Sequence, residues 1–294
     1  MTVFILSKQN KEAYENERLL TSFLNKNIPS MVVNPDQFDI VVNRDIRQGL
    51  HYQGKPIDLP KLLLVRTGAG TNSFTAAVIE QFEQAGVPCV NTLSSTITVK
   101  DKLRTNQILS KHGVAIPNTM LVRFPMDHDI VHDKIGWPCI VKVITGSHGD
   151  GVYLCEKKKD FKKLMGFIDS LKTRRTLILQ EYLGEQPGVD LRVLVIGGKV
   201  IGAMKRTAPD GDFRANISGG GTGESYEITQ EIDYIARESA KVLGLDIAGI
   251  DLLFDSRGFR VCEANSSPGF TGFEQFCDTD VADLITEYVK FKIQ

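Results

Sequence analysis

Short apolar runs alternate with amphipathic stretches over roughly the first ninety residues. The runs at 3–7 (VFILS), 31–33 (MVV) and 61–66 (KLLLVR) predict buried strands. The stretches at 11–27 and 74–84 predict helices between them. This βαβ alternation predicts a small parallel sheet. No GxGxxG follows the first strand, so the fingerprint of a dinucleotide-binding dehydrogenase is absent.

The pattern changes after Asn91. It predicts a helix at 97–112 that ends at Gly113. It then predicts strands at 137–144, 152–156 and 177–183, with a charged helix at 158–173 before the last strand. Further on it predicts a hairpin that turns at Gly197-Gly198, a helix at 229–243, two more strands and a last helix at 280–292. SGGGTG, at 218–223, predicts a flexible loop.

Composition sets the class of protein. The chain has 294 residues, of which 42% are hydrophobic and 24% charged, enough for two or three domains around a large core. A net charge of −1 without a basic stripe argues against nucleic acid as a partner. Five cysteines without a CxxC pair indicate neither a disulfide framework nor a zinc site. The first apolar run is too short for a signal peptide or a membrane span, so we expect a cytoplasmic protein with no membrane partner.

The stretch VCEANSSPGF, at 261–270, combines a strand pattern with oxygen-bearing side chains. Glu263 and Asn265 are two residues apart, so in a strand both point to the same face. Oxygen pairs on a rigid strand suit hard cations such as Mg²⁺. The alternative is an edge strand with a solvated polar face.

The preceding segment, DIAGIDLLFDSRGFR, supplies a partner strand. A three-residue loop at 256–258, with its glycine in the left-handed region, would close a hairpin. That loop pairs Asp255 with Phe259 and, counting outward, Asp251 with Glu263. Residues so opposed share a face, with Cβ atoms roughly 5 Å apart.

Two carboxylates at this distance repel each other unless a cation neutralises them. Asp251, Glu263 and Asn265 therefore form a predicted Mg²⁺ site, which leaves coordination positions for phosphate oxygens. Two carboxylates on a solvated face would leave the flanking apolar residues without a purpose.

A phosphate-binding segment is predicted at 142–156, KVITGSHGDGVYLCE. Gly146, Gly149 and Gly151 would let backbone N–H groups approach a phosphate chain. Lys142 lies in an apolar strand, where a lysine is costly unless it meets an anion. The segment lacks the GK[ST] ending of a P-loop, so it is not a Walker site.

Other polar positions complete a nucleotide site. The backbone of QEYL, at 180–183, could bind an adenine, and Asp190 is placed to accept from ribose hydroxyls. Cationic and amide groups gather around a predicted turn and would stabilise a transferring phosphate or a substrate carboxylate: Lys205, Arg206, Arg214 and Asn216. Surface charge is the alternative for each taken alone.

The order of these motifs resembles the ATP-grasp ligases, and closely their RimK-like branch, the glutamate ligases of ribosomal protein. The resemblance runs from about Thr67 to the C-terminus and is sharpest in KDKLRTNQILSKHG, VKVITGSHGDGV, GDFRANISGGG and CEANSSPGF. It implies an α/β ATP-grasp fold with an N-terminal parallel-sheet domain at 1–95, a central lid domain at 96–180 and a C-terminal mixed-sheet domain at 181–294.

The resemblance also implies roles for individual residues. Lys102 and Lys142 look like the ATP-phosphate lysines, and the loop with Gly146, Ser147, Gly149 and Gly151 looks like the lid over ATP. Glu181, Tyr182 and Leu183 match the adenine positions, and Asp190 matches the ribose carboxylate. Asp251, Glu263 and Asn265 match the metal ligands. Arg206, Arg214 and Asn216 match catalytic contacts, and Arg66 and Arg192 fall at the substrate cleft.

One position departs from the pattern. In the related D-alanine ligases an arginine stands two residues before the first metal aspartate, and here that residue is Gly249. Charge stabilisation is therefore expected from Arg206 or Arg214.

The implied reaction is ADP-forming ligation of a carboxylate and an amine through an acylphosphate, with ATP and two Mg²⁺ ions, or Mn²⁺ in their place. The expected substrates are glutamate or a similar acidic amino acid and an acceptor that is a small molecule, a peptide or a protein tail. We also expect a homo-oligomer. The alternatives are a phosphotransferase and a non-catalytic nucleotide-binding module on the same fold.

Overall fold

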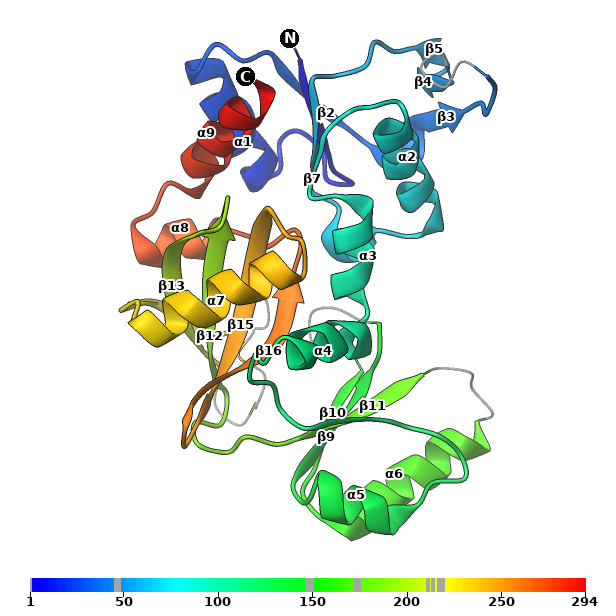
Figure 1. The fold of residues 1–294 in the computed structure, drawn as a ribbon, viewed down its shortest axis with the longest axis vertical. Helices are drawn as coiled ribbons and strands as arrows, with labels where there is room; N and C mark the ends of the chain where they lie inside the picture. Colours follow the sequence, from blue (N-terminus) through cyan, green and yellow to red (C-terminus); the bar gives the residue numbers. More distant parts are fainter. Residues whose placement is uncertain are drawn as a thin grey trace.

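The computed structural model describes residues 2–44, 49–145, 151–171, 176–209, 212, 215 and 220–294. Figure 1 shows three bodies, each built around its own sheet, with both chain termini at the upper end of the molecule. The central body lies at the opposite end of the molecule, and the C-terminal sheet lies between the two.

The N-terminal body contains the parallel sheet that the sequence predicts. Its strands run in the order β2-β1-β6-β7 and all pair in parallel. The bounds are β1 Val3–Leu6, α1 Tyr14–Asn25, β2 Ser30–Val33, β6 Leu62–Val65, α2 Ser73–Gln84 and β7 Cys89–Val90. A small antiparallel sheet was not predicted, because its strands have only two or three residues each: β3 Phe38–Ile40, β4 Leu50–Tyr52 and β5 Lys55–Pro56.

The central body is an antiparallel sheet with the order β10-β9-β11-β8. Two helices, α5 and α6, cover one face of this sheet (Figure 1). The bounds are β8 Thr119–Leu121, α5 His128–Lys134, β9 Cys139–Val143, β10 Val152–Cys155, α6 Lys158–Ser170 and β11 Leu177–Glu181. Its hydrophobic core, centred on Phe161, is a cluster of its own.

The C-terminal body is an antiparallel sheet with the order β14-β13-β12-β15-β16. The bounds are β12 Val189–Ile196, β13 Lys199–Thr207, β14 Thr222–Tyr226, α7 Gln230–Val242, β15 Ile247–Asp255, β16 Gly258–Asn265, α8 Thr271–Cys277 and α9 Val281–Ile293. The predicted turn at Gly197-Gly198 is confirmed. The loop predicted at 218–223 is wrong at its end, because Thr222 and Gly223 pair with β13; residues 216–219 lie outside the described part.

The helix predicted at 97–112 is two helices, α3 Leu93–Lys100 and α4 Lys102–Lys111. Asp101 separates them because its extended backbone ends α3 and its carboxylate accepts from the Arg104 N–H, which caps α4. Val99 and Leu109 pack into the core of the C-terminal sheet. Helices α3 and α4, at 93–111, thus pack against the C-terminal sheet. The domain boundaries predicted at 95 and 180 stay a proposal.

A single hydrophobic cluster joins the N-terminal and C-terminal bodies. From the N-terminal body it contains Val3, Leu19 and Phe23, and from the C-terminal body it contains Phe270 and Val289 among others. Helices α1 and α9 lie side by side across this contact (Figure 1). The two bodies are therefore held together by a shared hydrophobic core, as the parts of a single domain are. Within the described residues, no helix is long and apolar enough to cross a membrane.

Two adjacent glycines test how α9 packs on the β12–β13 turn. A Cβ on Gly197 would lie 2.7 Å from the Tyr288 ring, whereas one on Gly198 would meet nothing within 4 Å. Both have positive φ, so Gly198→Ala carries only backbone strain, about 1 kcal/mol. Gly197→Ala should lower the free energy of unfolding by about 1–3 kcal/mol more, because the ring must move. Urea unfolding of the two variants measures the difference, and equal losses would contradict this packing.

Candidate functional site

A cavity of about 960 Å³ lies where the three bodies meet. The N-terminal body contributes the residues that follow β1 and β6, among them Lys8 and Arg66. The central body contributes Lys142 and Gln180, and the C-terminal body contributes the β12, β13, β15 and β16 strands. Nearly all of the described site residues predicted from sequence line this cavity, and the local structure explains why each points there.

The β15–β16 hairpin brings the predicted metal ligands together, although by a different route from the one expected. Asp251 pairs with Glu263 as predicted. The loop, however, has two residues rather than three, because Asp255 pairs with Gly258 and not with Phe259. A register shift at Cys262 restores the count. Such bulges re-aim side chains next to active sites, and both Cys262 and Glu263 line the cavity.

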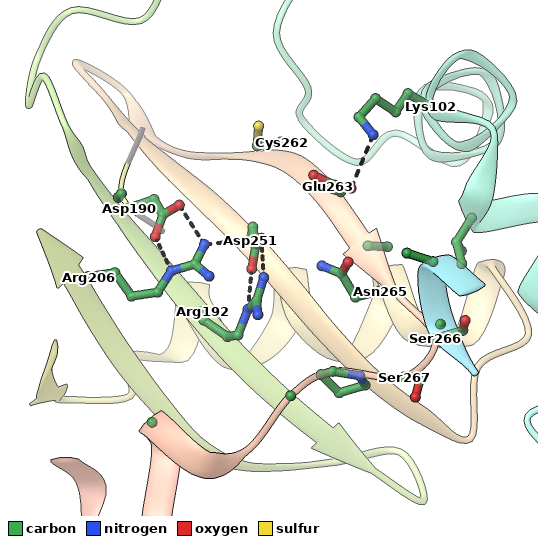
Figure 2. Close-up of a pocket in the computed structure, with 18 of the residues that line it drawn as sticks. Lys102, Asp190, Arg192, Arg206, Asp251, Cys262, Glu263, Asn265, Ser266 and Ser267 are labelled. Carbon is green, nitrogen blue, oxygen red and sulfur yellow. Dashed lines mark hydrogen bonds and ion pairs between the residues drawn. The ribbon is translucent and has the colours of Figure 1, made fainter. Parts of the chain in front are cut away.

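Asp251 is neutralised by two arginines of the neighbouring strands. Arg192, its register partner on β12, donates to both carboxylate oxygens at 2.8 and 2.7 Å, and Arg206 lies 3.1 Å away (Figure 2). Burial alone would raise the pKa of Asp251, but the charges of the two arginines outweigh it and lower that pKa. The repulsion expected between two unpaired carboxylates is therefore absent.

Asp190 completes this buried ion-pair network. Arg206 donates to both of its oxygens at 2.7 and 2.6 Å, and the side chain of Arg206 is only 4% exposed. The two carboxylates of Asp190 and Asp251 raise the pKa of Arg206 in spite of its burial. Asp190 faces the cavity, but its oxygens are bound to arginine, so it also fixes the position of Arg206.

The remaining predicted metal ligands, Glu263 and Asn265, make fewer contacts with polar groups than Asp251 does. Lys102, the first residue of α4, lies 3.3 Å from Glu263, and the Asn265 amide is 3.5 Å from the Gly249 carbonyl. Figure 2 shows Asp251, Glu263 and Asn265 side by side on the hairpin. Two carboxylates and an amide oxygen are donors that fit a hard cation. Among the described residues, no group of three His, Cys, Asp or Glu side chains is placed to hold a metal, and the role of these three residues as metal ligands stays a prediction.

Lys142 is buried at the wall of the cavity with neutral partners. Its ammonium donates to the Gln180 carbonyl at 2.6 Å and to the Cys262 sulfur at 3.6 Å. Burial raises the pKa of the Cys262 thiol more than the charge of Lys142 lowers it, so the sulfur is not an anion. In the described part of the chain Lys142 has no anionic partner, and a buried ammonium is costly without one.

The residues predicted to bind adenine lie at the end of β11. Tyr182 and Leu183 line the cavity, and burial raises the pKa of the Tyr182 phenol. The Glu181 carboxylate accepts from Asn118 at 2.6 Å and from Arg260 at 2.9 Å, so its side chain is already paired. Arg260 thereby connects the end of β11 to the β15–β16 hairpin.

The glycine-rich loop is described at its end only. A Cβ on Gly151 would lie 2.1 Å from the Val143 side chain, and its φ is +72°, so glycine is required there. Gly146, Ser147 and Gly149 lie outside the described residues. Arg214 and Asn216 do as well, although Ala215 between them is buried and lines the cavity.

Arg66 connects two bodies of the molecule. Its guanidinium donates to Glu15 at 2.7 Å and to the Pro268 carbonyl at 2.8 Å, and it lies over the Phe270 ring. Glu15 in turn accepts from the Phe270 N–H at 2.6 Å. A role of Arg66 in substrate binding stays a prediction, and its contacts add a structural role.

The glycine at 249 has a packing cause. A Cβ there would lie 2.7 Å from Pro268, because the Ser-Ser-Pro-Gly segment folds back over β15. An arginine cannot occupy this position without moving that segment. Arg192 on the adjacent strand provides the guanidinium beside Asp251 instead.

Comparison with known proteins agrees with this geometry. The RimK pre-ATP-grasp domain model matches residues 1–97, and the RimK-like ATP-grasp domain model matches residues 99–289. The chain belongs to the RimK-like ATP-grasp family. The predicted ATP-grasp fold and the predicted enzyme class, an ATP-grasp ligase, are confirmed.

Individual relatives support the same family. A probable alpha-L-glutamate ligase of Stutzerimonas stutzeri is 36% identical over 292 residues, which cover 99% of this chain and 95% of the relative. The ATP-grasp ligase PsnB, solved with a precursor variant, Mg and ADP, superposes with a TM-score of 0.77 at 19% identity, covering 99% and 98% of the chains. A RimK domain protein of Sphaerobacter thermophilus gives 0.74 at 17%, covering 98% and 99%.

Several side-chain pairings in this RimK-like site were missed from sequence, one of them at Gln180, which lies inside the predicted adenine stretch 180–183. Gln180, Arg260 and Glu15 pair with predicted site residues across 38, 79 and 51 positions, respectively. Gln180 alone carried a signal, since it is the polar residue of an apolar strand run. The others depend on contacts between bodies, which no local pattern encodes.

The two predicted metal carboxylates, Asp251 and Glu263, should differ in how much they contribute to the free energy of unfolding. Asp251→Asn leaves the buried Arg206 with one carboxylate and should lower the free energy of unfolding by about 3 kcal/mol. Glu263 has a 32% exposed side chain and one lysine partner, so Glu263→Gln should change it by less than about 1 kcal/mol. Urea unfolding without nucleotide or divalent cation measures both. Equal losses would mean that the arginine pairs do not stabilise the fold.

Proposed function

We propose that this protein is an ADP-forming carboxylate–amine ligase that adds glutamate, or a similar acidic amino acid, to a peptide, protein or small-molecule acceptor. The relatives' name, probable alpha-L-glutamate ligase, supports glutamate as the amino acid. PsnB, described as complexed with a precursor peptide, supports a peptide as one kind of acceptor. A cytoplasmic location and a homo-oligomeric state stay predictions from the sequence.

The observation that carries the proposal is the buried Lys142 without an anionic partner in the described residues. We assign the phosphates of ATP to this ammonium and to Lys102, and the adenine to the backbone of 181–183. Gly151 and the preceding loop would close over the phosphates. Asp190 is assigned to the ribose as well as to holding Arg206.

Asp251, Glu263 and Asn265 would hold Mg²⁺, whose charge offsets that of the phosphate oxygens during transfer. Two ions, or Mn²⁺ in their place, are part of the proposal. In this structure Lys102 forms an ion pair with Glu263, and Arg192 and Arg206 form ion pairs with Asp251, so the carboxylates that a metal would use are paired with cationic side chains. Metal binding therefore requires these side chains to turn toward the anionic substrates, which positions them for the reaction.

In the proposed reaction an acceptor carboxylate oxygen bonds to the γ-phosphorus while the bond to the β,γ-bridging oxygen breaks, releasing ADP. The amine of the amino acid then bonds to the acyl carbon, loses a proton, and phosphate leaves. Arg192 and Arg206, with Arg214 and Asn216, would stabilise the negative charge that develops on the oxygens. No side-chain nucleophile is required, since the protein positions the reactants.

The activity can be tested with ATP, Mg²⁺, glutamate and a panel of carboxylate acceptors. The expected products are ADP, phosphate and an acceptor heavier by one glutamyl residue, observed by mass spectrometry. Hydroxylamine should intercept the acylphosphate as a hydroxamate. A phosphotransferase would instead yield a stable phosphorylated acceptor, and a binding module would release no ADP.

Glu263→Gln should reduce amide formation by orders of magnitude at saturating Mg²⁺, because it removes a metal ligand without disturbing the arginine network. Glu12→Gln, at a residue with a 64% exposed side chain, is the control and should leave the rate unchanged. Initial rates of ADP release measure both. Near-normal turnover of the Glu263 variant would show that this carboxylate is not a ligand.

A further inference from the structure

The N-terminal sheet has a topological switch point that opens into the cavity. β1 lies between β2 and β6. The chain therefore passes from β1 to β2 on one side of β1, and then to β6 and β7 on the other side. Ligands of open α/β sheets bind outside the carboxyl ends of the strands at such a point. Lys8 and Arg66 follow the two strands there, and both line the cavity.

Two buried polar groups at this crevice have no hydrogen-bond partner among the described residues. The Arg66 side chain is 5% exposed, and its Nη1 is unpaired although Nη2 donates to Glu15 and Pro268. Thr96 on α3 is 2% exposed, and its Oγ1 is also unpaired. Both residues line the cavity. Buried polar groups are rarely left unsatisfied, so these two groups are available to a ligand with acceptor atoms.

The charges at the crevice are not balanced by the protein. Lys100, one helical turn after Thr96, donates to the Thr71 carbonyl and has no carboxylate partner in the described chain. Burial, and then the charge of Lys8, lower the pKa of Lys100. Lys8 is paired with Asp36 at 3.2 Å, and Arg66 with Glu15. One full positive charge therefore remains.

The crevice adjoins the proposed metal cluster. The turn at Gly68 packs on Ser267, with a hypothetical Cβ 3.4 Å from that side chain, and Ser267 is two residues from Asn265. A substrate bound at the crevice is thus within reach of the reacting phosphate. The phosphates of ATP are assigned to Lys142 and Lys102, so the crevice cations are left for another anion.

We propose that Lys8, Arg66, Thr96 and Lys100 form the subsite for the carboxylates of the incoming amino acid. This inference rests on the proposed ligase function. The acceptor's reacting carboxylate must meet the γ-phosphate, whereas the amino acid reacts through its amine and keeps all its carboxylates. Glutamate brings two such charges, and a carboxylate accepts from both the ammonium and the unpaired groups.

Lys100→Met tests the charge. Its kcat/KM for glutamate should fall about tenfold or more, while its kcat/KM for glutamine falls much less, so the preference for glutamate is lost. The KM for ATP and for the acceptor should not change. Lys11→Met is the control, since Lys11 is 73% exposed and outside the cavity. Equal losses for both amino acids, or a raised acceptor KM, would overturn the assignment.

Thr96→Val tests the unpaired hydroxyl by a different readout. Removing an unsatisfied hydroxyl should leave thermal stability equal or higher, yet weaken L-glutamate binding severalfold. Calorimetric titration of glutamate with ADP and Mg²⁺ present measures binding without turnover. Unchanged binding in both the Thr96 and Lys100 variants would overturn the subsite. A wild-type protein that binds glutamate but makes no amide would refute the proposed function and leave the subsite standing.

Discussion

Charged side chains face one another across the strands of the C-terminal sheet, and the cavity depends on their pairing. Arg206 opposes Asp190, Arg192 opposes Asp251, and Asp251 opposes Glu263. These register pairs form a row across β13, β12, β15 and β16 that steps by two residues along β12, from Asp190 to Arg192. Buried ion pairs gain little over well-packed apolar residues, because desolvation offsets their attraction. A row of this kind therefore stabilises the fold no more than well-packed apolar residues at the same positions would. It makes sense as a set of groups held ready for anions and cations that arrive together.

How much of this row could be predicted from sequence depended on separation along the chain. The Asp251–Glu263 pair belongs to one hairpin, where a turn and a two-residue period define the register. Even there, the loop was one residue too long, and the bulge at Cys262 compensated for the error. Arg192 is separated from Asp251 by 59 residues, and no local signal places the two strands side by side. The sequence could identify the carboxylates and the arginines as site residues, but not which arginine neutralises which carboxylate.

The same limit applied to the rest of the fold. The parallel sheet and the long hairpins were predictable because their apolar runs are long and their turns carry glycines. The break at Asp101 was not, since an aspartate in a polar stretch is compatible with a continuous helix as well as with a cap. The unpaired groups of Arg66 and Thr96 could not be predicted at all. Whether a polar atom is satisfied depends on every neighbouring body, and only the assembled structure shows it.

The hydrophobic cluster shared by the N-terminal and C-terminal bodies divides the molecule mechanically into two parts rather than three. The central body has a separate core and meets the others through polar contacts such as Arg260–Glu181 and Lys142–Cys262. Polar contacts exchange readily with water, whereas separating a shared apolar core does not occur without partial unfolding. The central body can therefore move against the other two without separating an apolar core. The joined N-terminal and C-terminal bodies carry both the proposed amino-acid subsite and the proposed metal cluster, so nucleotide exchange by such a movement would leave the proposed region of bond formation intact.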